Sequence, residues 1–218
     1  MNIKRWETMN EKEVRMFAGH LEARQDEERQ KSIIEGVPIV FDQRTDLGWW
    51  DEVIEKNALD KTDLRDVRLL VNHDTNQLPL ARSRNNNANS TMQLTVEEDG
   101  LHIRADLDVE NNPRAAEVLS AVEREDVTGM SFMFTVDKDS WEDLESDHPI
   151  RHIESIGKVF EASVVTFPAY EQTSVIARSL ESVKATLDSE KEALESARKT
   201  EELRKALLER STELCRKD

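Results

Sequence analysis

The sequence predicts an α+β protein with a sheet-rich body and a helical C-terminal tail. Residues 36–178 contain nearly all the segments in which apolar and polar residues alternate, which is the period of a β-strand. One helix pattern with clear start signals interrupts these segments. From Ser179 to Asp218 the chain has no glycine, proline or aromatic residue, which favours a helix. We therefore expect a body of residues 1–178 and a tail of residues 179–218.

The composition indicates which kinds of binding partner and which cellular compartment to expect. The 218 residues are enough for one core with an appendage, and the formal net charge of -16 disfavours binding to nucleic acid or anionic membranes. The one cysteine, Cys215, can form neither a disulfide framework nor a cysteine zinc cluster, as in a reduced cytosolic protein. Apolar runs stay well below the roughly 18–20 residues of a membrane span. The N-terminus lacks the apolar core of a secretory signal. We expect a soluble cytoplasmic product without a cofactor.

The highly charged first stretch, residues 1–35, has two interpretations. Val14, Met16 and Ala18, followed by Leu21 and Ala23, alternate with polar residues and indicate strands. A single charged helix is the alternative. The residues 25–31 are expected to form a solvated turn or a short helix.

The body then continues with strands. Val37, Ile39 and Phe41 alternate as in a half-buried strand, and an apolar run over residues 67–71 ends at Asn72-His73-Asp74. Alternation over residues 92–96 and 101–107, separated by a Glu98-Asp99-Gly100 turn, predicts a β-hairpin.

The clearest helix follows the hairpin. Asn112 can cap it and Pro113 suits its first position. One face is apolar, formed by Ala115, Val118, Leu119 and Val122. Beyond Gly129 the chain re-enters a strand over residues 130–134, and a last strand over residues 160–167 ends at Pro168.

The tail shows an incomplete heptad pattern. Leu180, Leu187, Leu194 and Leu208 lie in one row that Glu201 interrupts, and the companion row is mostly polar. A weak coiled coil and a marginal amphipathic helix both fit this pattern. The tail holds 9 Lys+Arg and 10 Asp+Glu, so nearly all of the negative charge belongs to the body.

Three residues have the types that serine protease chemistry needs. Such a site needs a hydroxyl, a base within hydrogen-bond reach and a third group that fixes the tautomer of the base. Ser131 lies where the Thr128-Gly129 turn meets an apolar strand, a junction that can present a hydroxyl at a strand edge. The alternative is a small polar residue that begins a strand.

The candidate base and its partner lie on other segments. His73 follows an apolar strand and begins a loop, where a plain surface histidine would also fit. Glu161 interrupts an otherwise apolar strand, on the same face as Ser163 and Val165. A buried carboxylate needs a partner, which a histidine can supply, and the alternative is an edge strand with Glu161 in solvent.

Other chemistries have weaker support. His148 and His152, with Glu142, Asp143 and Asp147 nearby, have helical metal-site spacing, but Pro149 predicts a loop followed by a strand. We therefore expect no metal site. The sequence has no glycine-rich phosphate loop and no G-x-S-x-G elbow.

The order of short segments over residues 12–178 resembles the tailed-phage prohead protease family, distant relatives of the herpesvirus maturation protease (assemblin). The matching segments are Glu35–Phe41, Trp50–Ile54, Val67–Asp74, Asp99–Leu101, Gly129–Phe132 with Phe134, Trp141, Glu161–Val165 and Thr166–Tyr170. The sequence departs from the family pattern at Leu80-Ala81-Arg82, where a glycine usually precedes the arginine.

The resemblance implies roles for particular residues. It makes His73 of the N-H-D segment and Ser131 of the M-S-F segment the catalytic pair. It places Glu161 as the third member, with His152 as the alternative, because the herpesvirus relatives use a second histidine. Asp74 is not expected as the third member, because on a strand its side chain would point away from that of its neighbour His73. Backbone N–H groups near Ser131 are the expected oxyanion donors.

The resemblance also implies a fold and a biological role. The fold would be a small, partly open β-barrel or mixed sheet surrounded by helices. The role would be an endopeptidase in the host cytoplasm, inside the procapsid, that cuts the scaffolding part of the major capsid protein and also itself. A linker near Arg178-Ser179 is a hypothetical self-cleavage region. The alternatives are a non-enzymatic scaffolding or capsid-binding protein with a vestigial triad, and a cytosolic hydrolase unrelated to phage assembly.

Overall fold

Two β-sheets and two helices make up the part of the chain that the structure describes, residues 12–17, 20–26, 31–166 and 174–214. The structure is a computed structural model. The first sheet contains β1 (Lys12–Phe17), β4 (Thr45–Asp46), β5 (Asp51–Ile54), β6 (Asp66–Val71), β7 (Ala81–Arg84), β10 (Gly129–Glu142) and β11 (Ile150–Val165). The second contains β2 (Leu21–Asp26), β3 (Lys31–Val40), β8 (Met92–Val96) and β9 (Gly100–Leu107). The helices are α1 (Pro113–Glu123) and α2 (Ser174–Leu214).

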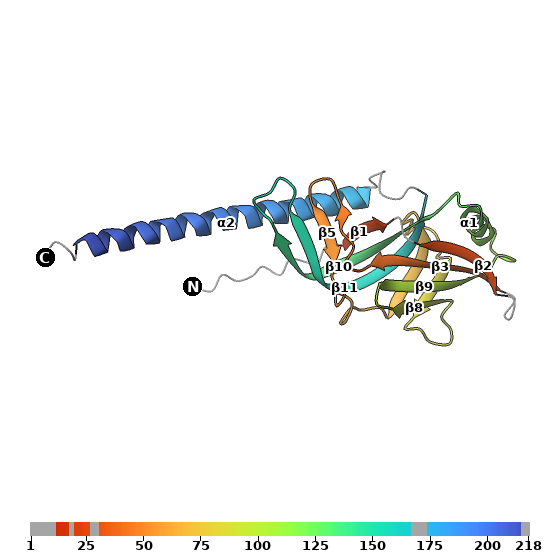
Figure 1. The fold of residues 1–218 in the computed structure, drawn as a ribbon. Coiled ribbons are helices and arrows are strands. Elements are labelled where there is room, and N and C mark those ends of the chain that lie inside the picture. The colour runs from red at the N-terminus through yellow and green to blue at the C-terminus, as the bar shows by residue number, and fades with distance from the viewer. Residues whose placement is uncertain (1–11, 18–19, 27–30, 167–173, 215–218) are drawn as a thin grey trace.

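The antiparallel pair β10 and β11 forms the spine of the first sheet (Figure 1). Strand β1 pairs with the free edge of β10. The other edge of β11 has two parallel partners in succession, β5 at residues 150–153 and β6 at residues 161–164. The two ends of this one long strand therefore have different surroundings.

Several predicted elements are confirmed. The hairpin predicted from the Glu98-Asp99-Gly100 turn is β8 and β9, paired antiparallel. Helix α1 begins at Pro113, and the side chain of Asn112 accepts hydrogen bonds from the N–H groups of Arg114 and Ala115. All four residues of its predicted apolar face are buried. The first stretch forms strands β1 and β2, which excludes a single charged helix there, while Ala18 lies outside the described residues.

The apolar core lies between the two sheets. One face of β10 contributes Met130, Phe132 and Phe134, and the second sheet contributes buried residues such as Ile34 and Leu101. Because side chains alternate along a strand, Ser131 lies on the face of β10 directed away from this core.

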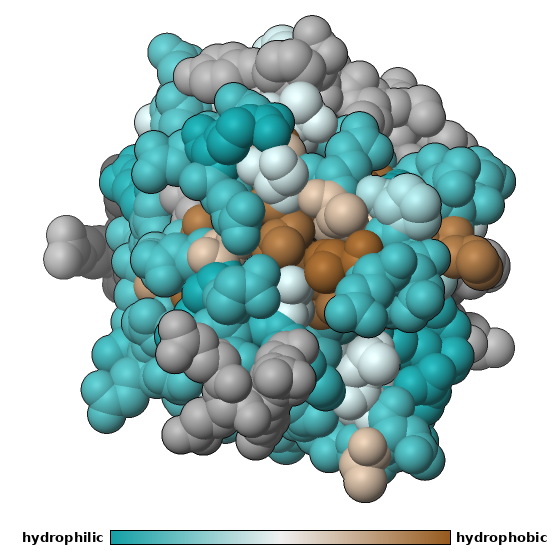
Figure 2. Space-filling model, turned by 90° about the vertical axis from the view of Figure 1, so that its right-hand side faces the viewer, coloured by the Kyte–Doolittle hydropathy of each residue, from teal (hydrophilic) through white to brown (hydrophobic). Residues whose placement is uncertain are grey.

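The predicted barrel is only partly correct, because the strands form two separate sheets that do not close on each other. Helices also do not surround these sheets within the described residues: α1 contacts β2 and β3, and α2 contacts β1. Figure 2 shows the end of the molecule that carries α1, where hydrophobic side chains gather at the centre of a hydrophilic surround.

The C-terminal tail forms helix α2, which begins at Ser174 and so includes Arg178 and Ser179. The predicted linker at that position is therefore wrong. Val183 and Leu187 are buried, and Leu203 is 64% exposed. The early part of α2 packs on the body, and the later part extends beyond the sheets (Figure 1). Neither described helix is both long enough and apolar enough to cross a membrane.

Candidate active site

The register of β10 and β11 brings polar side chains together on the outer face of the first sheet. Ser131 pairs with Ser163, and Met133 pairs with Glu161. Directly paired residues on antiparallel strands share a face. Glu161 is 3% exposed and Ser163 is fully buried, because β11 is an interior strand. The alternative of an edge strand with Glu161 in solvent is therefore wrong.

The loop after β6 carries His73 back over β11. Asn72 and His73 both have left-handed backbone conformations, with φ of 51° and 57°. The Asn72 N–H donates to the carbonyl of Val164 at 3.0 Å, and the Asn72 side-chain oxygen accepts the N–H of Thr166 at 3.0 Å. Left-handed residues reverse the chain sharply, so this turn directs the imidazole toward the strand that β6 has just paired with.

His73 and Glu161 form a buried pair. Nδ1 of His73 lies 2.6 Å from Oε1 of Glu161, and both side chains are 3% exposed. An ionised carboxylate only accepts hydrogen bonds, so Nδ1 carries the proton and the lone pair is on Nε2. Nε2 of His73 is buried and has no hydrogen-bond partner among the residues that the structure describes. A histidine with this tautomer and a free Nε2 is suited to take a proton.

Ser163 joins this pair, although its role was not predicted from the sequence. Its hydroxyl donates to Oε2 of Glu161 at 2.6 Å and accepts the backbone N–H of His73 at 3.1 Å. The available signal was its position two residues after Glu161, on the same face of the same strand. We call His73, Glu161, Ser163 and Ser131 the outer-face cluster.

Ser131 is not at a strand edge, contrary to the expectation from the Thr128-Gly129 turn. It lies in the stretch of β10 that is paired with β1 on one side and β11 on the other, and it is fully buried. Its hydroxyl donates to the backbone carbonyl of Arg15 in β1 at 2.6 Å. Ser131 thus faces Ser163 across the strand pair, with its proton directed to β1 rather than to His73.

The same double pairing affects the expected oxyanion donors. Each N–H of a strand points to one of its two neighbours, and residues 130–134 of β10 have paired strands on both sides. The backbone N–H groups beside Ser131 are therefore committed to the sheet in this structure. The expectation of free amide donors at that position is not met.

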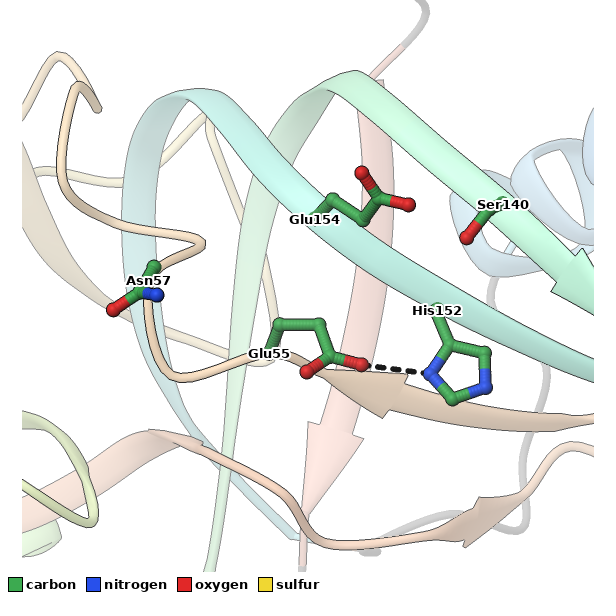
Figure 3. A pocket seen from close by; sticks show the side chains of 5 residues that line it. All are labelled: Glu55, Asn57, Ser140, His152 and Glu154. Carbon is green, nitrogen blue, oxygen red and sulfur yellow. Dashed lines mark hydrogen bonds and ion pairs between the residues drawn. The ribbon is translucent and has the colours of Figure 1, made fainter.

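His152 lies near the other end of β11, away from the outer-face cluster. Its Nδ1 is 2.7 Å from Oε1 of Glu55 and its Nε2 is 3.1 Å from Oε2 of Glu142. Figure 3 shows it in a surface pocket with Glu55, Asn57, Ser140 and Glu154. The structure thus does not place His152 as the orienting partner of His73.

His148 and His152, for which no joint metal site is predicted, have different neighbours in the structure. Nε2 of His148 lies 3.0 Å from Asp51 and 3.7 Å from Asp46, so its neighbours differ from those of His152. The ligand atoms of His148, Asp46 and Asp51 lie within 4.8 Å of one another.

A second buried polar group lies on the core side of the same sheet. Arg15 contacts Glu13 and Glu52, and Arg151 contacts the same two carboxylates. Burial opposes ionisation of Glu13, but Arg15 and Arg151 outweigh it and lower the Glu13 pKa. Burial also opposes the charge of Arg151, yet Glu13 and Glu52 raise its pKa. We call these four residues the charge cluster.

Comparisons with known proteins show the family of this chain. Residues 19–188 match the family model described as caudovirus prohead serine protease. The prohead protease of Enterobacteria phage HK97 is 29% identical over 165 residues, which covers 74% of this chain and 67% of that protein. The structure of the bacteriophage T4 capsid assembly protease covers 72% of this chain and 98% of its own, with 12% identity and a TM-score of 0.45. Because the family model spans well over half of the chain, this protein belongs to the caudovirus prohead serine proteases and is a serine protease.

Proposed function

We propose that this protease matures the capsid by using Ser131 as nucleophile, His73 as general base and Glu161 as the group that orients His73. The observation that carries the proposal is the hydrogen bond between His73 Nδ1 and Glu161, which leaves Nε2 free. The outer-face position of Ser131, opposite Ser163, supports its assignment as the nucleophile. Family membership supports the class of reaction.

The proposed reaction begins when the Ser131 hydroxyl turns from the Arg15 carbonyl toward Nε2 of His73. His73 takes the hydroxyl proton while Oγ attacks the peptide carbonyl carbon, which gives a tetrahedral intermediate. Glu161 stabilises the imidazolium that forms. His73 then gives the proton to the departing amine, and an acyl-enzyme on Ser131 remains. Water, deprotonated by His73, releases the acid product and restores the serine.

The proposed substrates are the scaffolding part of the major capsid protein and the protease itself, cut in the host cytoplasm inside the procapsid. The printed names of the family and of the phage relatives support this setting. Residues 1–178 would form the protease domain and residues 179–218 a helical appendage that docks to shell or scaffold. Self-cleavage near Arg178-Ser179 would first require α2 to unwind, because both residues are helical.

The test is intact-mass spectrometry over time on the wild type and Ser131→Ala, each purified alone and each co-expressed with the phage capsid protein precursor. We expect the wild type to cut the precursor, and Ser131→Ala to lower the rate by a factor on the order of 10⁴–10⁶, as for other triads. Ser83→Ala is a matched control, because Ser83 is also a fully buried strand serine. Cleavage by Ser131→Ala at the wild-type rate would refute the assignment. An uncut precursor with both proteins would favour a non-enzymatic scaffolding role.

A further inference from the structure

We propose that Ser163 is a positioning residue for the protease reaction, whose hydroxyl holds both the proposed base and the carboxylate that orients it. This inference rests on the proposed roles of His73 and Glu161. One oxygen makes both contacts: it donates to Glu161 Oε2 at 2.6 Å and accepts the His73 N–H at 3.1 Å. Ser163 is fully buried, so water cannot replace either contact without a change in packing.

The contact with Glu161 acts on the carboxylate. Oε1 of Glu161 accepts a hydrogen bond from the His73 ring, and Oε2 accepts one from the Ser163 hydroxyl. Both carboxylate oxygens therefore have a donor. Hydrogen bonds to the charged form of a carboxyl group favour ionisation, which burial alone would oppose. The two bonds from opposite sides also fix the plane of the carboxylate. Ser163 therefore holds the Glu161 carboxylate directed at Nδ1 of His73.

The contact with His73 acts on the backbone. His73 and the residue before it are non-glycine residues with left-handed φ, a strained conformation for residues that carry a Cβ. Such a turn persists only when surrounding contacts hold it. The Ser163 hydroxyl is one of these contacts, and it ties the amide of the base to the strand that carries Glu161. One side chain thereby contacts both members of the His73–Glu161 pair.

A purely structural role for the hydroxyl makes a different prediction. If Ser163 only stabilises the strand, its removal lowers the amount of folded protein. Its effect on the rate is then independent of other substitutions, so the factors of two variants multiply. If Ser163 acts partly through Glu161, its removal has a smaller effect once the carboxylate has been replaced. The combination of Ser163→Ala with Glu161→Gln separates the two roles.

The experiment measures cleavage of the co-expressed capsid precursor, normalised to folded protein. We expect Ser163→Ala to lower the rate about 10- to 100-fold, the range for a lost hydrogen bond to a charged group. Ser83→Ala should stay within about twofold of wild type. It is a close control because the Ser83 hydroxyl also donates one bond and accepts one bond, both with Asn86. In the Glu161→Gln background, Ser163→Ala should lower the rate by a smaller factor than it does in the wild type, because only the contact with the His73 N–H remains to be lost.

A second pair of variants keeps the test decisive if Ser163→Ala does not fold. Threonine and valine have nearly the same shape, so Ser163→Thr and Ser163→Val differ mainly in the hydroxyl. Ser163→Thr should be at least tenfold faster than Ser163→Val. Equal rates for this pair, or multiplicative effects in the double variant, would overturn the inference. If Ser131→Ala or His73→Ala cleaves at the wild-type rate, the proposed function itself fails, which is a distinct result.

Discussion

Two buried polar clusters lie on the same sheet, and they differ in how completely their polar atoms are paired. In the charge cluster, each of the four side chains is paired with opposite charge, and Arg151 also contacts Asp139. In the outer-face cluster, Nε2 of His73 has no partner within the described part of the chain. A buried polar atom without a partner does not stabilise a fold, whereas a free Nε2 beside a paired Nδ1 is what a general base requires. The fully paired cluster is explained by structure alone.

Strand β1 connects the two clusters. The side chain of Arg15 belongs to the charge cluster, while its backbone carbonyl accepts the hydroxyl of Ser131. The partners of β1 in the charge cluster come from β5 and β11, so these ion pairs anchor an edge strand to the interior of the sheet. The charge cluster thus helps to fix the position of the group that holds the proposed nucleophile at rest.

The largest effect on stability is expected from breaking the charge cluster. Arg151→Ala removes the contacts to Glu13 and Glu52, which leaves an excess of buried negative charge. Removing one partner of a buried ion pair costs about 3–5 kcal/mol. Urea unfolding should show a loss of this size. Arg124→Ala is the matched control, because its ion pair with Asp126 is more than half exposed and should contribute little. Equal losses would contradict the contrast between buried and exposed pairs.

A smaller effect should appear in the pH dependence of the same cluster. Burial opposes ionisation of Glu13, but Arg15 and Arg151 lower its pKa below the ordinary value of 4.5. Its ionised form therefore contributes stability above about pH 4.5, and this contribution is lost as pH falls through the lowered folded pKa. The unfolding free energy of wild type should exceed that of Glu13→Gln most above pH 5. The difference should narrow toward pH 3, and a constant difference would refute the assignment.

Local sequence signals were sufficient where local physics determines structure. The cap at Asn112 and proline at the next position marked helix α1, and the Glu98-Asp99-Gly100 turn marked the hairpin. His73 and Glu161 were identified because each interrupts or ends an apolar run, and the structure brings them together. Their catalytic roles, like that of Ser131, remain predictions until the variants are measured.

The charge cluster could not be predicted from the sequence. Its members are charged residues in charged surroundings, and that pattern usually marks a solvated surface. They lie on β1, β5 and β11, so only the tertiary fold brings them together. The sequence also did not predict that β10 pairs with a strand on each side. The turn before Ser131 indicated where a strand begins, but not which strands lie next to it.

The smallest predicted effect concerns the turn that aims His73. Asn72 has a φ of 51°, and its side chain bonds with Thr166. Asn72→Gly loses the side-chain bonds but accepts the left-handed conformation, whereas Asn72→Ala also strains the backbone. Asn72→Ala should therefore be less stable than Asn72→Gly by about 1 kcal/mol in urea unfolding. A more stable alanine variant would show that this backbone strain is absent and would weaken the argument that the turn must be held in place to position the base.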